Sequence, residues 1–303
     1  MVEKAVELPP TEAVDSDLAD FDQRPVADQL RLLLAGQAHA IAAVQACLDP
    51  LTQAVEAASE RLRGSTGRLI YAGAGCSIRI GVQDGVELVP TFGWPLSRLA
   101  YLIAGGPDAL AVSVEGAEDD QQAASRDIEA IAVSANDVVI GIAASGNTPY
   151  TCQVIADASQ CGALTIGVSS NPTGQLLHLA DHGLFTDTGA EVLAGSTRLA
   201  AGTAQKALLN AFSTTLMTAL GRVLGNEMLC VQANNAKLKD RQARILIGQV
   251  PSMDLQSARE LLSSVGWDLR VALLVAHGMA ESDAHTAIAT EQPFRTLWSN
   301  YSG

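Results

Sequence analysis

Residues 69–85, LIYAGAGCSIRIGVQDG, change character within a few positions. The segment begins as an apolar run, passes through glycine and alanine at residues 73–75, and continues with isoleucine and valine at a spacing that favours a helix. A glycine lets the backbone approach a ligand closely, and the first N–H groups of a helix are free to bind an anion. The stretch therefore predicts a strand, a loop and a helix that together bind a negatively charged ligand.

The same alternation of short apolar strands and helices continues along the chain. Strands rich in valine, isoleucine and leucine that are separated by helices favour a parallel sheet covered on both faces. We therefore predict an α/β fold of three layers, a flavodoxin-like parallel sheet sandwiched by helices. The expected strands are residues 68–74, 99–106, 137–145, 164–170 and 182–188.

The segments on either side of this sheet domain lack the alternation of strands and helices. Residues 1–63 are expected to form an acidic arm followed by two helices that Pro50 separates, since proline cannot donate inside a helix. The sheet domain is assigned to residues 64–245 and ends in one long helix that begins near Gly195. Residues 246–303 contain three short amphipathic stretches and are interpreted as a small helical appendage.

The composition and motifs of the chain limit the kinds of ligand and cofactor that we expect it to bind. The 303 residues carry a net charge of −14, which disfavours binding to nucleic acid or to an anionic membrane. The five cysteines lack CxxC spacing, and the N-terminus lacks an apolar signal core, so we expect a cytoplasmic protein with reduced thiols. No group of ligand-type residues predicts a metal site. The third glycine of a GxGxxG dinucleotide motif is absent after residues 73–75.

Three loops that follow expected strands are rich in glycine and hydroxyl side chains. Ligands of open α/β sheets bind beyond the carboxyl ends of the strands, so residues 73–77, 144–149 and 168–172 together predict a site for a phosphorylated ligand. The alternative is that these serines only cap helices and turns. The candidate binding residues are Gly75, Cys76, Ser77, Ser145, Gly146, Asn147, Thr148, Ser169 and Ser170.

Five segments, in order, resemble the N-acetylmuramic acid 6-phosphate etherases. These are sugar isomerase (SIS) domain proteins, to which the glucokinase regulatory protein is more distantly similar. The resemblance covers residues 11–245 and continues weakly beyond them. Its segments are residues 67–93, 114–120, 137–150, 189–217 and 225–245.

The resemblance implies cleavage of the D-lactyl ether of N-acetylmuramic acid 6-phosphate, without a metal or an organic cofactor. Glu118 matches the base that removes the proton from carbon 2, and Glu87 matches the acid that protonates the departing lactyl oxygen. The apolar neighbours of Glu87 in the sequence predict a raised carboxyl pKa. Ser196 and Thr197 are further candidates for binding the substrate, followed by Thr203 and Lys206.

This chain departs from the family pattern at Ile78, Asn147 and Ala200, where the family usually has glycine, arginine and lysine. We expect the branched side chain of Ile78 to crowd the phosphate loop, and the two lost cations to weaken binding of an anion. A non-catalytic phosphosugar-binding regulator and a phosphosugar isomerase therefore stay open as alternatives. The resemblance also implies a homodimer with its active site near the subunit interface.

Overall fold

The computed structural model describes residues 9–233, 235–290 and 292–299. Its centre is a sheet of five parallel strands in the order β2-β1-β3-β4-β5. The register pairs Tyr71 with both Tyr101 and Ile140. The α/β fold with a parallel sheet, expected from the sequence, is confirmed. The strands are β1 (Leu69–Gly73), β2 (Leu99–Ile103), β3 (Val138–Ile142), β4 (Leu164–Ser169) and β5 (His182–Phe185).

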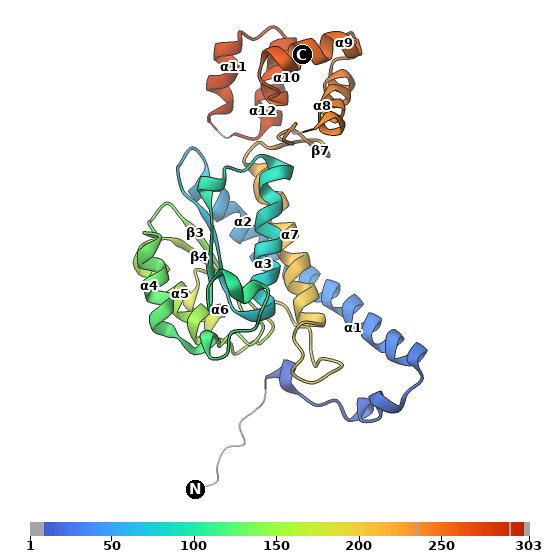
Figure 1. Ribbon diagram of the computed structural model, residues 1–303, viewed down its shortest axis with the longest axis vertical. Coiled ribbons are helices and arrows are strands. Elements are labelled where there is room, and N and C mark those ends of the chain that lie inside the picture. Colours follow the sequence, from blue (N-terminus) through green and yellow to red (C-terminus); the bar gives the residue numbers. More distant parts are fainter. Residues whose placement is uncertain (1–8, 234, 291, 300–303) are drawn as a thin grey trace.

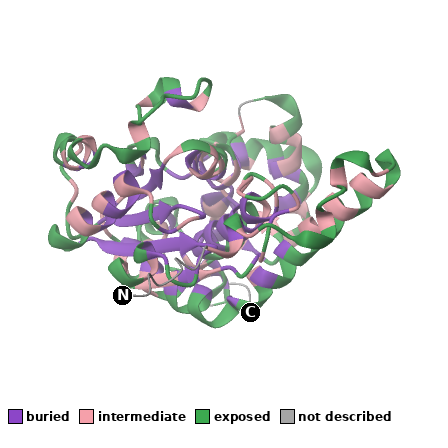
Figure 2. Cartoon of the chain, turned by 90° about the horizontal axis from the view of Figure 1, so that it is seen from below, coloured by how far each residue is buried: buried purple, intermediate pink, exposed green. Residues whose placement is uncertain are grey.

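Helices cover both faces of the sheet, as Figure 2 shows by the buried strands between exposed helix surfaces. One face packs on α2 (Leu48–Leu62), α3 (Gly75–Phe92) and α7 (Ala200–Ala219), and the other on α4 (Gln121–Ala130), α5 (Pro149–Gln160) and α6 (Gln175–Leu179). The two cores contain alternate residues of the strands, for example Tyr71 on the first face and Ile70 on the second. This division explains why the strands are apolar at almost every position.

The N-terminal helices α1 (Val26–Ala46) and α2 meet at Cys47 with a bend of 61°. The break lies three residues before the predicted one, because Pro50 sits in the first turn of α2, where its missing N–H has no partner to lose. No single helix among the described residues is long and apolar enough to cross a membrane, and α1 and α2 satisfy that test only when taken together. In Figure 1, α1 projects from the body of the protein.

The long helix expected from Gly195 begins instead at Ala200. Both carboxylate oxygens of Glu191 accept hydrogen bonds from the first amides of α7, those of Ala200 and Ala201, at 2.9 Å. A buried carboxylate at this position satisfies amides that would otherwise have no partner and interacts favourably with the helix dipole. Residues 195–199 therefore form a loop.

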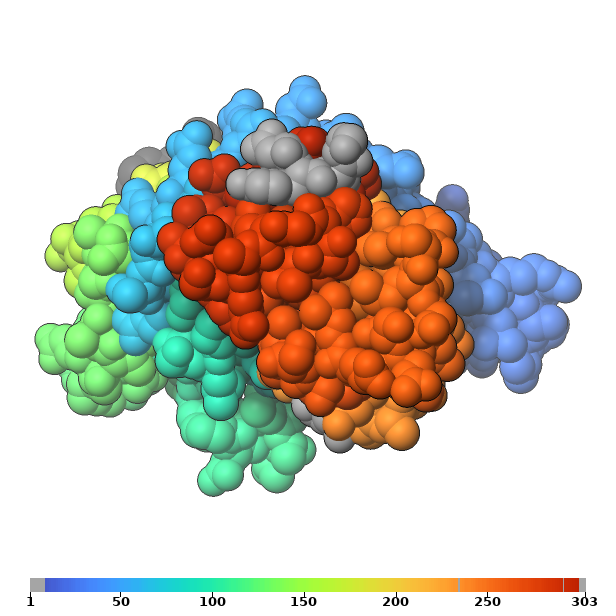
Figure 3. Space-filling model, turned by 90° about the horizontal axis from the view of Figure 1, so that it is seen from above, coloured from blue at the N-terminus to red at the C-terminus, as the bar shows by residue number. Residues whose placement is uncertain are grey.

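The C-terminal helices form a separate core at one end of the protein, seen from above in Figure 3. This core includes Leu246 of α8, so the predicted boundary at residue 245 falls inside that helix. A two-stranded hairpin, β6 (Val223–Leu224) and β7 (Glu227–Met228), precedes it and was not predicted, although its Gly225-Asn226 turn is a hairpin signal. The helices are α8 (Ala236–Gln249), α9 (Leu255–Ser264), α10 (Leu269–Ala276), α11 (Glu281–Ile288) and α12 (Phe294–Ser299).

A buried ion pair joins the beginnings of two central strands. Asp137, only 2% exposed, accepts hydrogen bonds from the backbone and the guanidinium of Arg68, at 2.8 Å each, and from the amide of Ser134. Burial alone would raise the pKa of Asp137, but these hydrogen bonds and the charge of Arg68 lower it below its usual value. The pair therefore stabilises the fold while the carboxyl group is ionised.

We expect Asp137→Ala to reduce the free energy of unfolding by about 3 kcal/mol, because the half-buried guanidinium of Arg68 and the amides of Arg68 and Ser134 then lose a buried carboxylate partner. The lowered pKa sets the pH dependence. The contribution is fully present above about pH 5 and is lost as the pH falls from about 4 through the folded-state pKa. Urea unfolding at pH 7 and at pH 3.5 measures both effects. The control is Asp240→Ala in the exposed pair with Arg259, for which we expect less than about 1 kcal/mol. Equal losses in the two variants would contradict the prediction.

Candidate active site

A cavity of about 420 Å³ lies at the carboxyl ends of β1 and β3. It brings together residues from five parts of the chain: the N-terminal arm, the loop after β1, the loop after β3, the segment before α4 and the segment before α7. Eight of the predicted site residues line it: Gly75, Cys76, Ser77, Glu118, Ser145, Asn147, Thr148 and Thr197. Glu12, Asp119 and Pro149 also line it, with alanines at positions 74, 143 and 144.

Two helices begin at this cavity without a side chain that caps them. Ala74 and Thr148 occupy the N-cap positions of α3 and α5, and neither side chain accepts a hydrogen bond from the helix. The hydroxyl of Ser77 lies inside α3 and accepts a hydrogen bond from Gln205 at 3.1 Å, so it does not cap the helix either. Since the first residue of α5 is Pro149, which has no N–H, the amides that remain available to an anion are the first ones of α3 and those that follow Pro149 in α5. The two helix dipoles also favour an anion there.

Close packing holds the loop after β3 in place. Gly146 has a φ of +67°, and a Cβ added to it would lie 2.6 Å from Ser169 Oγ and 2.7 Å from Gly174 Cα. Ser169 and Ser170 are fully buried behind this loop. The hydroxyl of Ser169 donates to the carbonyl of Ala144, and that of Ser170 bonds to Thr186. These two serines support the loop from behind and do not line the cavity.

The helix α7 contributes less to the cavity than expected. Glu191 occupies its first amides, Thr197 lines the cavity, and Ser196 does not. Thr203 donates to Gln37 of α1, and Lys206 bonds to Asn210 one turn further along α7. Both side chains are therefore engaged with α1 or with α7 itself.

The carboxylates at the cavity come from two segments. Glu118 and Asp119 lie in the short turn before α4, and both are exposed. Glu12 reaches the cavity from the N-terminal arm, because the carbonyl of Thr11 accepts a hydrogen bond from Gly195 at 2.9 Å and Thr11 is buried. We did not predict Glu12: it lies in an irregular segment whose docking is not visible in any periodic pattern.

Glu87 lies away from the cavity within a single chain. It is exposed on α3, beside the exposed Val86, so the apolar setting expected from the sequence is absent in the isolated chain. It follows Ser77 by ten residues, which is roughly 15 Å along the axis of an α-helix. This separation is too long for Glu87 to act on a monosaccharide whose phosphate binds at the start of the same helix.

Two of the departures from the family pattern have a structural reason. Ile78 is fully buried in the core beneath the loop, beside Ile142, so it does not crowd the cavity as we expected. Ala200 is buried with Ala40 of α1 and Ala204, where a lysine would have no room. Asn147 is held by its own contact, since its side-chain oxygen accepts a hydrogen bond from the amide of Gln175.

Arginine side chains lie near the beginning of α3. Burial raises the pKa of the Cys76 thiol, while the charges of Arg79 and Arg198 act in the opposite direction. Cys76 therefore lies close to both guanidinium groups, and its thiol stays protonated at neutral pH. In a chain with a net charge of −14, two arginines beside uncapped helix ends make this region suited to an anion.

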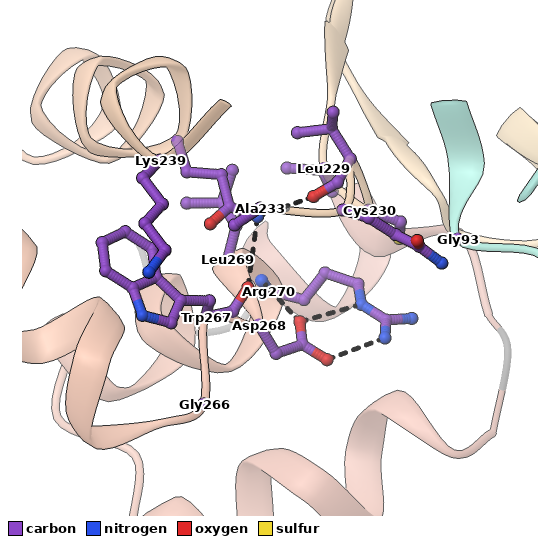
Figure 4. A pocket seen from close by; sticks show the side chains of 13 residues that line it. Gly93, Leu229, Cys230, Ala233, Lys239, Gly266, Trp267, Asp268, Leu269 and Arg270 are labelled. Atoms are coloured by element: carbon purple, nitrogen blue, oxygen red, sulfur yellow. Dashed lines mark hydrogen bonds and ion pairs between the residues drawn. The ribbon is translucent and has the colours of Figure 1, made fainter. Parts of the chain in front are cut away.

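A different cavity, of about 460 Å³, lies where the end of α3 meets the C-terminal core (Figure 4). The ammonium group of Lys239 lies 4.7 Å from the centre of the Trp267 ring, and Asp268 pairs with Arg270 at 2.8 Å. None of the predicted site residues lines it. Lys239 contacts the Trp267 ring and Asp268 pairs with Arg270, so these charged groups are engaged within the cavity wall, which is typical of a structural junction.

The parallel sheet, with loops rich in glycine and hydroxyl side chains at the carboxyl ends of its strands, is that of a SIS-domain protein. Residues 119–215 match the SIS domain, and residues 50–158 match the glucokinase regulatory protein N-terminal SIS domain. Among solved structures, a phosphoheptose isomerase from Francisella tularensis is similar with a TM-score of 0.45 and 17% identity, over 64% of this chain and 97% of that chain.

Related proteins identify the family more specifically than the domain matches do. The N-acetylmuramic acid 6-phosphate etherase of Deinococcus radiodurans is 45% identical over 265 residues, which cover 88% of this chain and 86% of that protein. The etherase of Streptomyces coelicolor is 44% identical over 91% of this chain and 88% of its own length. The chain belongs to the N-acetylmuramic acid 6-phosphate etherase family, a family of carbon–oxygen lyases.

The packing behind the loop after β3 leads to a test. We expect Gly146→Ala to weaken binding of N-acetylglucosamine 6-phosphate by about tenfold or more, because the loop must move away from Ser169 and Gly174. The control is Gly189→Ala: its φ is also positive, but no atom lies within 4 Å of the added Cβ. Calorimetric titration of both variants measures the difference. Unchanged affinity in Gly146→Ala would show that this loop does not hold the phosphate.

Proposed function

We propose that this protein cleaves the D-lactyl ether of N-acetylmuramic acid 6-phosphate, giving N-acetylglucosamine 6-phosphate and D-lactate. The observation that supports it best is the cavity in which Glu118 lies opposite two uncapped helix ends, in a chain more than 40% identical to etherases over most of its length. The phosphate binds at the amides of α3 and α5, and the sugar extends toward Glu118. The regulator and isomerase alternatives are not favoured by these relatives.

The reaction requires an acid and a base. Glu118 removes the proton from carbon 2 of the open-chain sugar, where the aldehyde makes that proton acidic, and the bond between carbon 3 and the lactyl oxygen breaks. A protonated carboxyl group, which we assign to Glu87, gives its proton to the departing oxygen. Water then adds across the double bond, with its oxygen on carbon 3 and a proton on carbon 2.

Because Glu87 lies away from the cavity of its own chain, we assign this role to Glu87 of the partner subunit in a homodimer. The support is a surface without a partner in the single chain: Val26, Leu30, Leu34 and Ile41 of α1 are 44–71% exposed. At about 100° per residue they fall within an arc of about 80° on one side of the helix. Apolar surface of this kind is typical of an isologous interface.

The unpaired cysteines agree with a cytoplasmic location, which we include in the proposal because reduced thiols persist there. All five are free in the described structure, and two of them, Cys47 and Cys152, are buried. The substrate, a phosphorylated sugar, is also a compound that cells retain inside by its charge.

Glu118→Gln should reduce the rate of D-lactate release by about 10²- to 10⁴-fold, since an amide cannot remove the proton. An enzymatic assay of D-lactate with the purified protein measures this. Glu129→Gln, an exposed carboxylate on α4 outside the cavity, is the matched control and should retain the full rate. Full activity in Glu118→Gln would exclude it as the base.

Mixing two inactive variants tests whether the site is shared between subunits. Glu87→Gln and Glu118→Gln dimers that exchange subunits should recover about a quarter of the wild-type activity, because each mixed dimer then has one intact site. If both glutamates acted within one chain, every site in the mixture would be damaged and no activity would return. A dimer-disrupting Leu34→Glu variant should sediment as a monomer and show no recovery under the same mixing.

A further inference from the structure

A second cavity, of about 330 Å³, adjoins the first one. Ala74, Gly75 and Glu118 line both cavities, so the two are neighbouring parts of one depression at the start of α3. The first cavity extends to the amides of α5, whereas the second extends to residues 113–118 and to Ala109. Glu118 lies where they meet.

Arg79 is the cationic residue that lines the second cavity. It lies one turn into α3, and its Nη2 donates a hydrogen bond to the carbonyl of Ala109 at 2.9 Å, which holds the guanidinium at the cavity wall. Among the described residues Arg79 has no carboxylate partner within ion-pair distance, although Glu115 and Glu118 line the same cavity. The rest of its planar fork is therefore free to bind a ligand carboxylate, the group whose geometry it matches.

We propose that Arg79 recognises the carboxylate of the lactyl group, and that the second cavity holds this group during the reaction. The inference rests on the proposed function. The substrate carries two anions, a phosphate at carbon 6 and a carboxylate on the substituent of carbon 3. When the phosphate lies at α5 and carbon 2 faces Glu118, the substituent on the next carbon extends beyond Glu118, into the cavity that Arg79 lines.

The carboxylates beside Arg79 affect how strongly the second cavity holds the lactyl group before and after the ether bond breaks. Glu115 and Glu118 repel a carboxylate in the second cavity, so without Arg79 this part of the site would exclude the lactyl group. With Arg79 the group binds while it is tethered to the phosphosugar. After the ether bond breaks, free lactate keeps only this one contact beside two repelling carboxylates, which favours its departure.

The test compares two ligands that differ only in the lactyl group. Binding of N-acetylmuramic acid 6-phosphate and of N-acetylglucosamine 6-phosphate is measured by calorimetry in a Glu87→Gln background, because the loss of Glu87 suppresses turnover while the same background serves both ligands. Adding Arg79→Met should weaken binding of the lactyl ligand by about tenfold to a hundredfold and leave the other ligand within about twofold. Arg259→Met in α9 controls for the change in net charge and should alter neither affinity.

Equal weakening for both ligands, or no change for either, would overturn the proposal. If Arg79→Met does not fold, Arg79→Lys is tested in its place, because lysine keeps the positive charge but lacks the planar guanidinium. It should weaken the lactyl ligand selectively by about fivefold, and an equal effect on both ligands would again overturn the assignment. Release of D-lactate by the wild-type protein is measured separately, so a failure of the proposed function is distinguished from a failure of this contact.

Discussion

The first backbone amides of a helix must find partners outside the helix. Three helices of this protein differ in whether a side chain provides those partners. In α7 the buried Glu191 takes the two leading amides, which closes that helix to ligands. In α3 and α5 no side chain does so, and both helices begin at the same edge of the sheet. The order β2-β1-β3 places their preceding strands side by side, so the two sets of amides meet over one cavity. The proposed phosphate site is therefore a consequence of strand order combined with the absence of side-chain caps on these two helices.

The sequence was sufficient for the sheet and for the loops after β1 and β3, because apolar strands and glycine-rich turns are local signals. It was insufficient where the role of a residue depends on burial. From the sequence, Ser169 is equivalent to Ser145, but in the structure it is buried and supports the loop after β3 from behind. Ile78 was expected to crowd the phosphate loop, but its side chain is buried in the core. Glu12 was missed because the docking of the N-terminal arm depends on a hydrogen bond between Thr11 and Gly195, residues distant in the sequence. Such contacts are tertiary and leave no periodic trace.

Glu87 is exposed and lies outside the cavity that Glu118 lines, so one chain does not bring the two members of the predicted acid–base pair into one cavity. A helix about 18 residues long cannot present both its start and a residue three turns later to one monosaccharide. The apolar surface of α1 and the exposed Val86 beside Glu87 are features that a monomer would leave in water. A second subunit that covers them would exclude water from the surroundings of the Glu87 carboxyl group. The apolar setting that the sequence suggested for Glu87 would then arise between chains.

A protein of net charge −14 that binds a doubly charged anion must rely on short-range interactions. Charges separated by more than about 10 Å are screened in physiological salt, so the distant acidic surface matters less than the groups at the cavity. There, two helices begin at the first cavity, Arg79 lines the second one, and Glu118 lines both. In the proposed site, the two anions of the substrate would therefore each bind through short-range contacts, on either side of Glu118.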